Sequence, residues 1–326
     1  MYTIEDLRNV EKEIAELSEV RKKIMSEIAV SGGNVFAEDA EKLPWRADFK
    51  GVDSLDINED TVVAYQGVPG AYSHQAMFKF FGDDIKNINV EAFEDVIDVI
   101  NSGKADYGVL PIENSSAGFV NGIYDMVGKS NLTVVGEDRV HVAHALLGVP
   151  GARISDIRQV YSHPQGLMQC KDFLDTTDWE RINVANTAVA AQKVINEQDR
   201  THAAIASELA GRIYGLDILK KGIVNNNNNT TRFIILARGK MYVKSGKNVI
   251  ISFSLPHESG TLYNILSNIN LNGINLTNIE SRPLKGKTWE YKFFVTMEGN
   301  MDDPRTISAL SGIYRDSLDF RLIGTY

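Results

Sequence analysis

The segment "VNNNNNTTRFIILARGK", Val224 to Lys240, contains the change of pattern that decides the fold. Five asparagines lead into two threonines and an arginine, and an apolar run from Phe233 to Ala237 follows. β-Branched and aromatic residues in so short a run are typical of a buried strand. Asparagine tolerates turn conformations, so residues 225–229 predict a loop whose end is anchored by Thr231. The first three asparagines are either part of a mobile loop or a plain spacer.

Upstream of this strand, short β-branched runs alternate with helical patterns from Thr61 onward. Such alternation predicts an α/β domain with largely parallel strands, and ligands in these folds bind at the carboxyl ends of strands. The expected strands are "TVVAYQG", "YGVLPIE", "LTVVGED", "RQVYSHP", "HAAIASE" and "TRFIILAR", and the expected helices are "GAYSHQAMFKFF", "FEDVIDVINSG", "GLMQCKDFLD" and "TAVAAQKVINE".

Downstream, residues 248–326 form a separate pattern. It contains a strand, a helix, two strands, a helix and a final strand, in the order βαββαβ. This order is that of the ferredoxin-like fold.

The N-terminal segment predicts one long helix that ends near "SGG", Ser31 to Gly33. Its apolar residues recur at spacings of three and four, with Arg21 at one core position. A single helix cannot bury such a stripe on itself, so we expect it to pack on the rest of the chain or on a second subunit. A short helix within residues 34–43 and a linker follow, with a domain boundary near residue 60. The stripe consists of Leu7, Val10, Ile14, Leu17, Ile24 and Ile28.

The overall composition is that of a globular protein with two or three domains: 326 residues, 43% hydrophobic and 24% charged. The net charge of −9 argues against a nucleic-acid partner, because binding phosphates needs a basic surface. The single cysteine, Cys170, excludes an internal disulfide, and the N-terminus is too charged for a signal peptide. Without a run long enough for a membrane span, we expect a cytoplasmic protein.

Five blocks between Thr61 and Ala237 resemble the prephenate dehydratase family, in family order: "GVPGAYSHQA", "ADYGVLPIENSSAG", "YSHPQGLMQC", "NTAVAAQKV" and "NNTTRFIILAR". The resemblance implies a catalytic domain of two α/β lobes around a cleft, like a periplasmic binding protein. Residues 248–326 resemble the ACT regulatory domain of the same family. We therefore expect a helical segment at 1–60, a catalytic domain at 61–240 and an ACT domain at 247–326.

By this resemblance the substrate is prephenate, which loses CO2 and water to become phenylpyruvate in L-phenylalanine biosynthesis. The protein must bind the pyruvyl carboxylate and offer a proton to the departing hydroxyl, without holding the ring carboxylate that leaves. This chemistry requires no metal and no organic cofactor. His141 and His144 are three positions apart on a predicted strand and therefore face opposite sides, which disfavours a metal pair.

The resemblance assigns the catalytic role to Thr231, whose hydroxyl stays protonated at working pH. Arg232 suits a carboxylate, although neighbours on a strand face opposite sides. Glu113 competes as proton donor if burial raises its pKa, and His163 is a further candidate acid.

Further substrate contacts are expected from polar residues at the ends of strands and the starts of helices, and from Phe233, which packs the motif. The turn before the helix "GAYSHQA" can receive an anion on its backbone N–H groups. Thr187 is expected to cap its helix, while Ala188 stands where relatives often have a serine. The residues are Ser73, Asn114, Ser115, Ser116, His163, Gln165, Thr187 and Phe233.

The N-terminal "EVRKKIMSEIA" resembles the end of the first helix of a chorismate mutase domain, with Arg21 at the position of a catalytic arginine. The other residues of that site and a third helix are missing. We therefore expect a remnant without mutase activity, used for packing or dimerisation.

In the ACT-like segment, the resemblance implies that phenylalanine binds at the start of the first helix and across a subunit interface. It thereby implies feedback inhibition of a homodimer or homotetramer. Two alternatives stay open: the same chemistry on arogenate, and a non-catalytic amino-acid sensor. The phenylalanine-binding candidates are Gly260, Thr261, Leu262, Glu280, Ser281, Arg282 and Pro283.

Overall fold

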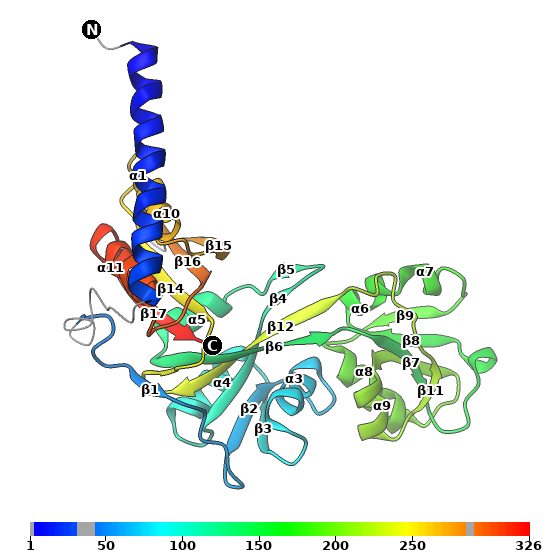
Figure 1. Cartoon of the computed structure of the whole chain (residues 1–326). Coiled ribbons are helices and arrows are strands. Elements are labelled where there is room, and N and C mark those ends of the chain that lie inside the picture. Colours follow the sequence, from blue (N-terminus) through cyan, green and yellow to red (C-terminus); the bar gives the residue numbers. More distant parts are fainter. Residues whose placement is uncertain (1–2, 31–42, 285–289) are drawn as a thin grey trace. The chain divides into compact units, whose positions relative to one another are not determined.

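The computed structural model describes residues 3–30, 43–284 and 290–326 (Figure 1). The chain forms two compact units. One comprises residues 1–56, 127–135 and 239–326, and the other comprises residues 57–126 and 136–238. The short helix expected within residues 34–43 lies almost wholly outside the described residues.

The unit at 57–126 and 136–238 contains two sheets, which define two lobes. In the first lobe the strand order is β12-β4-β2-β3, with β2 parallel to β3 and β4, and β12 antiparallel to β4. Apolar residues of β2, β4 and β12 are buried in its core. The elements are β2 (Val62–Gln66), α3 (Tyr72–Phe81), β3 (Lys86–Val90), α4 (Phe93–Asn101), β4 (Tyr107–Asn114), β5 (Gly118–Phe119), α5 (Ile123–Lys129), β6 (Leu132–His141) and β12 (Thr230–Arg238), of which α5 and β6 extend into residues 127–135 of the other unit.

The second lobe has the strand order β11-β7-β10-β8-β9, in which β10 is parallel to β8 and antiparallel to β7. Alanines of α8 and β10 fill much of its core, so the helix packs close to the sheet. The predicted α/β fold class is confirmed. The elements are β7 (His144–Gly148), η1 (Ile154–Asp156), β8 (Gln159–Ser162), α6 (Pro164–Gln169), α7 (Lys171–Leu174), β9 (Glu180–Asn183), α8 (Thr187–Glu197), β10 (His202–Ser207), α9 (Glu208–Tyr214) and β11 (Asp217–Lys220).

The other unit has the predicted βαββαβ order, with an antiparallel sheet in the order β15-β16-β14-β17. Helices α10 and α11 pack with this sheet around Phe253 and Leu310. The elements are β1 (Lys50–Val52), β13 (Met241–Val243), β14 (Asn248–Ser254), α10 (Thr261–Leu271), β15 (Leu276–Pro283), β16 (Tyr291–Glu298), α11 (Pro304–Asp316) and β17 (Leu318–Thr325).

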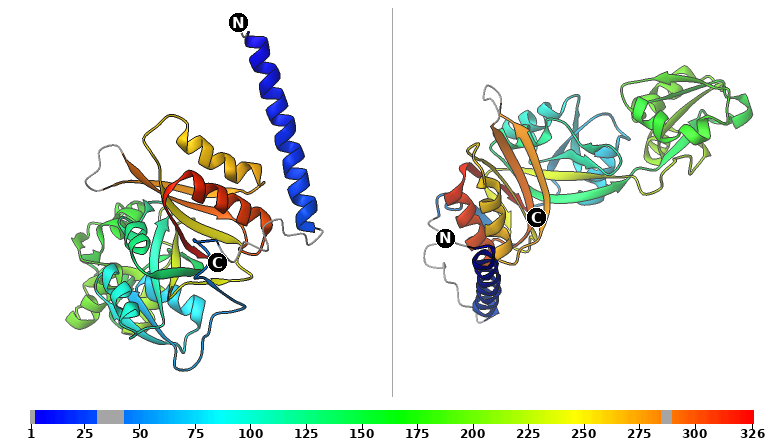
Figure 2. Two further views of the ribbon diagram at one scale, coloured as in Figure 1. Left: turned by 90° about the vertical axis from the view of Figure 1, so that its left-hand side faces the viewer. Right: turned by 90° about the horizontal axis from the view of Figure 1, so that it is seen from above.

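The long N-terminal helix α1 (Ile4–Val30) begins with Thr3 and Asp6 bonded to each other and runs without interruption (Figure 2). It contacts α11 and α10. The stripe residues from Leu7 to Ile24 are nevertheless exposed, with Leu7 at 59% and Leu17 at 61%. Within the described ranges, no helix is both long enough and apolar enough to cross a bilayer.

Candidate active site

Thr231 lies at the start of β12, directly opposite Asn114 at the end of β4. The Asn114 Nδ2 group donates to Thr231 Oγ1 at 2.9 Å and to Asn229 Oδ1 at 2.8 Å. On the other side, Asn114 Oδ1 accepts from the backbone N–H groups of Ser116 and Ala117, both at 3.0 Å. These two acceptor bonds fix which way the amide points. Because Thr231 Oγ1 accepts from Asn114, its own hydrogen is free to be donated elsewhere.

Thr231 opens into a cavity of about 320 Å³ between the two lobes. The residues lining this cavity carry polar groups but no carboxylate, lysine or arginine. We call it the Thr231 cavity. From the first lobe come Gln66, Tyr72, Asn114, Val120 and Thr231, from the connecting segment comes Val142, and from the second lobe come His144, His163, Gln165, Gly166, Gln169, Ala185, Asn186 and Thr187.

The N-terminus of α8 makes its side of the Thr231 cavity favourable for an anion. Asn186 is the N-cap of this helix and accepts from Val189 N at 2.8 Å. The prediction that Thr187 caps the helix is therefore wrong; Thr187 is the first helical residue, and asparagine is the stronger cap. The N–H groups of the first turn have no acceptor within the helix, and the helix dipole favours an anion there. A carboxylate can thus be held in this cavity without an arginine.

Glu113 and Arg232 lie elsewhere. Arg232 forms ion pairs with Glu113 at 3.2 Å and Glu137 at 3.6 Å. Glu113 and Arg232 line a separate cavity of about 210 Å³ with Ser115, Arg139 and Thr230. The reason is strand geometry: side chains alternate along β4 and β12, so Asn114 and Thr231 face one side while Glu113 and Arg232 face the other. The structure does not bring the three predicted catalytic residues together.

Of the predicted substrate contacts, the structure gathers Asn114, His163, Gln165 and Thr187 around Thr231. His163 is the N-cap of α6, where its Nδ1 accepts from Gln165 N at 3.2 Å. The remaining four do not line the Thr231 cavity. Ser73 and Phe233 are buried, Ser115 is bonded to residues 228 and 230, and Ser116 is exposed.

The asparagine run is tied to the protein at both ends. Asn229 is buried, and its backbone oxygen accepts from Val142 N at 2.8 Å. Asn225 N donates to Gln169 O at 2.7 Å, and Asn225 Oδ1 accepts from Asp172 N at 3.2 Å. The plain-spacer interpretation therefore fails for the first asparagine, which fixes the loop against the second lobe.

Tyr72, His144 and Gln169 are among the lining residues that were not predicted as site residues. The Tyr72 hydroxyl lies 3.0 Å from His144 Nδ1, and His144 Nε2 lies 3.0 Å from Gln169 Oε1. Burial lowers the pKa of His144 and raises the pKa of Tyr72. These residues come from α3, β7 and α6, so only tertiary structure places them side by side.

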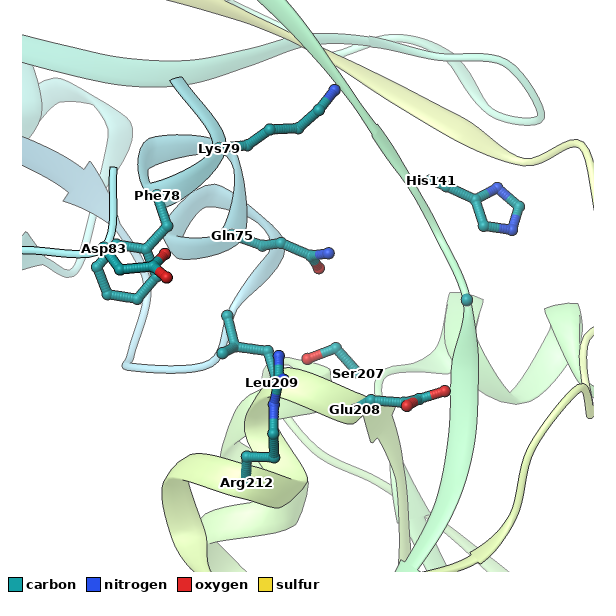
Figure 3. A pocket seen from close by; sticks show the side chains of 10 residues that line it. Gln75, Phe78, Lys79, Asp83, His141, Ser207, Glu208, Leu209 and Arg212 are labelled. Carbon is teal, nitrogen blue, oxygen red and sulfur yellow. The ribbon is translucent and has the colours of Figure 1, made fainter. Parts of the chain in front are cut away.

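A second cavity, of about 460 Å³, lies between α3 and α9 (Figure 3). α3 supplies Gln75, Phe78 and Lys79, and α9 supplies Glu208 and Arg212. Although larger, it contains neither Thr231 nor Asn114, so the chemistry expected of those residues belongs to the smaller cavity.

The segment between the lobes separates these two cavities. His141 and Ala143 line the one in Figure 3, whereas Val142 and His144 line the Thr231 cavity. The two histidines thus face opposite sides, as their spacing predicts. Among the residues that the structure describes, no group of three or more His, Cys, Asp or Glu could hold a metal ion.

The phenylalanine-binding candidates divide into two groups. Gly260 is the N-cap of α10 with φ of 86°, and Thr261 Oγ1 donates to the backbone oxygens of Pro256 and Glu258 at 3.2 and 3.1 Å. Thr261 and Leu262 line a cavity of about 100 Å³ that also includes Tyr291. The second group, Glu280, Ser281, Arg282 and Pro283, lies on the edge strand β15, outside that cavity.

Comparison with known proteins agrees with this architecture. The model of the family described as prephenate dehydratase matches residues 63–241. Arogenate dehydratase/prephenate dehydratase 1, chloroplastic, of Arabidopsis thaliana is 36% identical over 308 residues, which is 89% of this chain and 78% of the relative.

Two solved structures are also similar. A prephenate dehydratase from Arthrobacter aurescens in complex with L-Phe has a TM-score of 0.75 and 27% identity, covering 82% of this chain and 89% of that one. A protein described as a novel type of quorum quenching acylase has a TM-score of 0.76 and 29% identity, covering 81% of this chain and 97% of that one. The family match spans the domain that holds Thr231 and Asn114, and the chain belongs to the prephenate dehydratase family.

Proposed function

We propose that this protein converts prephenate into phenylpyruvate, CO2 and water. The observation that carries the proposal is the Thr231 hydroxyl, held by Asn114 with its hydrogen free, inside a cavity whose lining includes no aspartate, glutamate, lysine or arginine. Such a cavity can bind an anionic ring while leaving one carboxylate without a cationic partner. That is the requirement for a substrate that must lose a carboxylate as CO2.

The proposed mechanism assigns one task to each part of the cavity. The start of α8, with Thr187, holds the pyruvyl carboxylate. Thr231 passes its hydroxyl proton to the leaving hydroxyl, which departs as water. The ring–carboxylate bond breaks, CO2 leaves, and the electron pair of that bond completes the aromatic ring as the carbon–oxygen bond breaks. A proton from solvent then restores the Thr231 hydroxyl.

The same lining favours prephenate over arogenate. Arogenate carries an ammonium where prephenate has a keto group, and a carboxylate is the partner that holds an ammonium most strongly. The residues lining the Thr231 cavity include no aspartate and no glutamate. We therefore propose that prephenate is the better substrate.

Competition between the two substrates tests this proposal. Equal concentrations of prephenate and arogenate are offered to the purified protein, and phenylpyruvate and phenylalanine are separated and quantified. We expect phenylpyruvate to dominate. A dominant phenylalanine product would favour arogenate, and the absence of both products would overturn the proposed activity.

We also propose that the βαββαβ segment is an ACT domain that binds L-phenylalanine in a homodimer or homotetramer and inhibits the enzyme. Three features support this: the open turn at Gly260, the cavity beside Thr261 and Leu262, and the edge strand β15 carrying residues 280–283. The solved relative from Arthrobacter aurescens is a complex with L-Phe. A calorimetric titration without phenylalanine binding would contradict the proposal.

For α1 we propose a role in packing between subunits and no chorismate mutase activity. Arg21 is the one residue on this helix that matches the position of a mutase arginine, and the described part of the chain contains no helical bundle of the mutase type around it. The test is chorismate consumption by the purified protein, which should not exceed the uncatalysed rate.

A further inference from the structure

The turn that precedes α3 belongs to the first lobe by sequence but packs against the second. Gly70 O accepts from Ser207 Oγ at 2.9 Å in a buried position. A Cβ at Gly70 would lie 2.7 Å from Ala210 Cα, so only glycine fits here. Val68 and Ala71 pack on the apolar core of the second lobe. Of the N–H groups in this turn, where the sequence predicts an anion site, that of Gly70 donates to His74 Nδ1 at 3.1 Å.

One residue further on, Tyr72 forms a polar contact between the lobes. Its hydroxyl lies 3.0 Å from Nδ1 of His144, which is 3% exposed. His144 Nε2 faces Gln169 Oε1 at 3.0 Å, and because an amide oxygen can only accept, Nε2 carries the hydrogen. Nδ1 is then an acceptor, and Tyr72 donates to it. Burial favours the neutral form of both rings.

The Tyr72–His144 hydrogen bond joins two residues that line the Thr231 cavity. Tyr72 and Thr231 line the cavity from the first lobe, while His144, His163 and Thr187 line it from the second. The distance from the Thr231 hydroxyl to the leaving hydroxyl of a substrate whose carboxylate is held at α8 therefore depends on the alignment of the lobes. A misplacement of about 1 Å can lower a rate by roughly 100-fold.

We propose that the Tyr72–His144 hydrogen bond is a positioning contact that holds the two lobes at the separation needed for Thr231 to act on substrate. This inference rests on the proposed dehydratase function. Tyr72 and His144 are positioning residues, and neither exchanges a proton with the substrate. Gln169 contributes by fixing the His144 tautomer.

A double-mutant cycle tests the proposal. Tyr72→Phe removes only the hydroxyl, and His144→Leu removes the acceptor at similar volume. We expect each to lower kcat by about tenfold, with KM within about twofold of wild type, because the binding groups of each lobe remain. The double variant should be no slower than either single variant, since both remove the same bond. Multiplied losses, or a raised KM with unchanged kcat, would instead make Tyr72 an independent substrate contact and overturn the proposal.

Two further variants separate positioning from general damage. His144→Asn places an acceptor near the former Nδ1 and should recover part of kcat, but only when Tyr72 is present. Tyr161→Phe is the matched control, because Tyr161 is a buried residue whose hydroxyl forms a part-buried bond to Gln159 within the second lobe at 2.8 Å. It should keep the wild-type kcat. An equal loss of kcat in Tyr161→Phe would mean that removing any internally bonded tyrosine hydroxyl slows the reaction, which would overturn the positioning role of Tyr72.

A distance measurement tests whether the Tyr72–His144 bond fixes the separation of the lobes, and it does not depend on enzymatic activity. Spin labels at Asp84→Cys and Asp178→Cys, which replace exposed residues of the two lobes, report lobe separation, and Cys170 is buried. Dilution with unlabelled protein suppresses distances between subunits. Tyr72→Phe should broaden the distance distribution, and Tyr161→Phe should not. An unchanged distance distribution in Tyr72→Phe would overturn the proposal. If the wild type is inactive but Tyr72→Phe broadens the distance distribution, only the proposed reaction is overturned.

Discussion

Asn114 sets the direction of the Thr231 hydroxyl, because its amide is fixed by two backbone N–H groups on one side and donates to Thr231 on the other. A side chain that only accepts would reverse this arrangement. Thr231 would then donate to residue 114 and have no hydrogen left for a leaving group.

The corresponding prediction concerns Asn114→Asp. The carboxylate keeps the shape and the bonds to Ser116 N and Ala117 N, so the fold should persist. Activity should fall by about 100-fold, a loss typical of removing one oriented donor from an active site. Steady-state kinetics and a melting curve check this together. A variant with wild-type kcat would show that the direction of the Thr231 hydroxyl is unimportant.

The pKa shifts of His74 and His144 predict how the stability of the fold depends on pH. Burial lowers the pKa of both below the ordinary 6.5. Below pH 6.5 the unfolded chain therefore binds protons that the folded chain does not, and stability falls as the pH decreases. Each histidine contributes at most about 1.4 kcal/mol per pH unit.

Melting temperatures between pH 7.5 and 5.5 check this prediction. We expect little change above about pH 7 and a decline below about pH 6.5, where ordinary carboxylates are still ionised. His74→Gln should make the decline shallower. A melting temperature that rises on acidification through this window would contradict the assignment.

At the scale of elements, the turn before α3 fixes how one lobe meets the other. Gly70 combines φ of 88° with the close approach to Ala210, whereas Gly82 has φ of 93° and open space where a Cβ would lie. An alanine at either position would pay for the positive φ, but only an alanine at Gly70 would also clash with Ala210. Comparing the two variants therefore separates backbone strain from steric conflict.

We predict that Gly70→Ala destabilises the protein by about 2–4 kcal/mol and Gly82→Ala by about 1–2 kcal/mol. Chemical denaturation of both variants measures the difference. Equal effects would show that the contact between Gly70 and Ala210 yields without cost and does not constrain the lobes.

At the scale of the whole molecule, the exposed apolar stripe of α1 predicts association between copies of the chain. Replacing Leu7, Ile14 and Leu17 by lysine should shift the protein toward smaller assemblies in sedimentation velocity. Alanine at Lys12 and Glu16, an exposed ion pair on the same helix, is the control and should change nothing. A triple variant that sediments like wild type would exclude α1 from the interface.

Sequence patterns predicted much of this molecule because β-branched runs and helical periodicities are local signals. The strands around Val109 and Ile235 and the βαββαβ order follow from such signals. The opposite placement of Thr231 and Arg232 follows from strand alternation, but which of the two faces the cavity depends on the pairing of β12 with β4. The bond between Tyr72 and His144 joins distant segments, so no local pattern contains it.

The central claim, that Thr231 acts on prephenate in this cavity, is tested most directly by comparing wild type with Thr231→Ala and Thr231→Ser. Phenylpyruvate is followed by absorbance, and prephenate binding is followed by calorimetry. We predict that Thr231→Ala binds prephenate but turns it over at least about 100-fold more slowly, while Thr231→Ser keeps part of the rate. Thr231→Ala with wild-type turnover would contradict the claim, as would a folded wild type that binds prephenate without converting it.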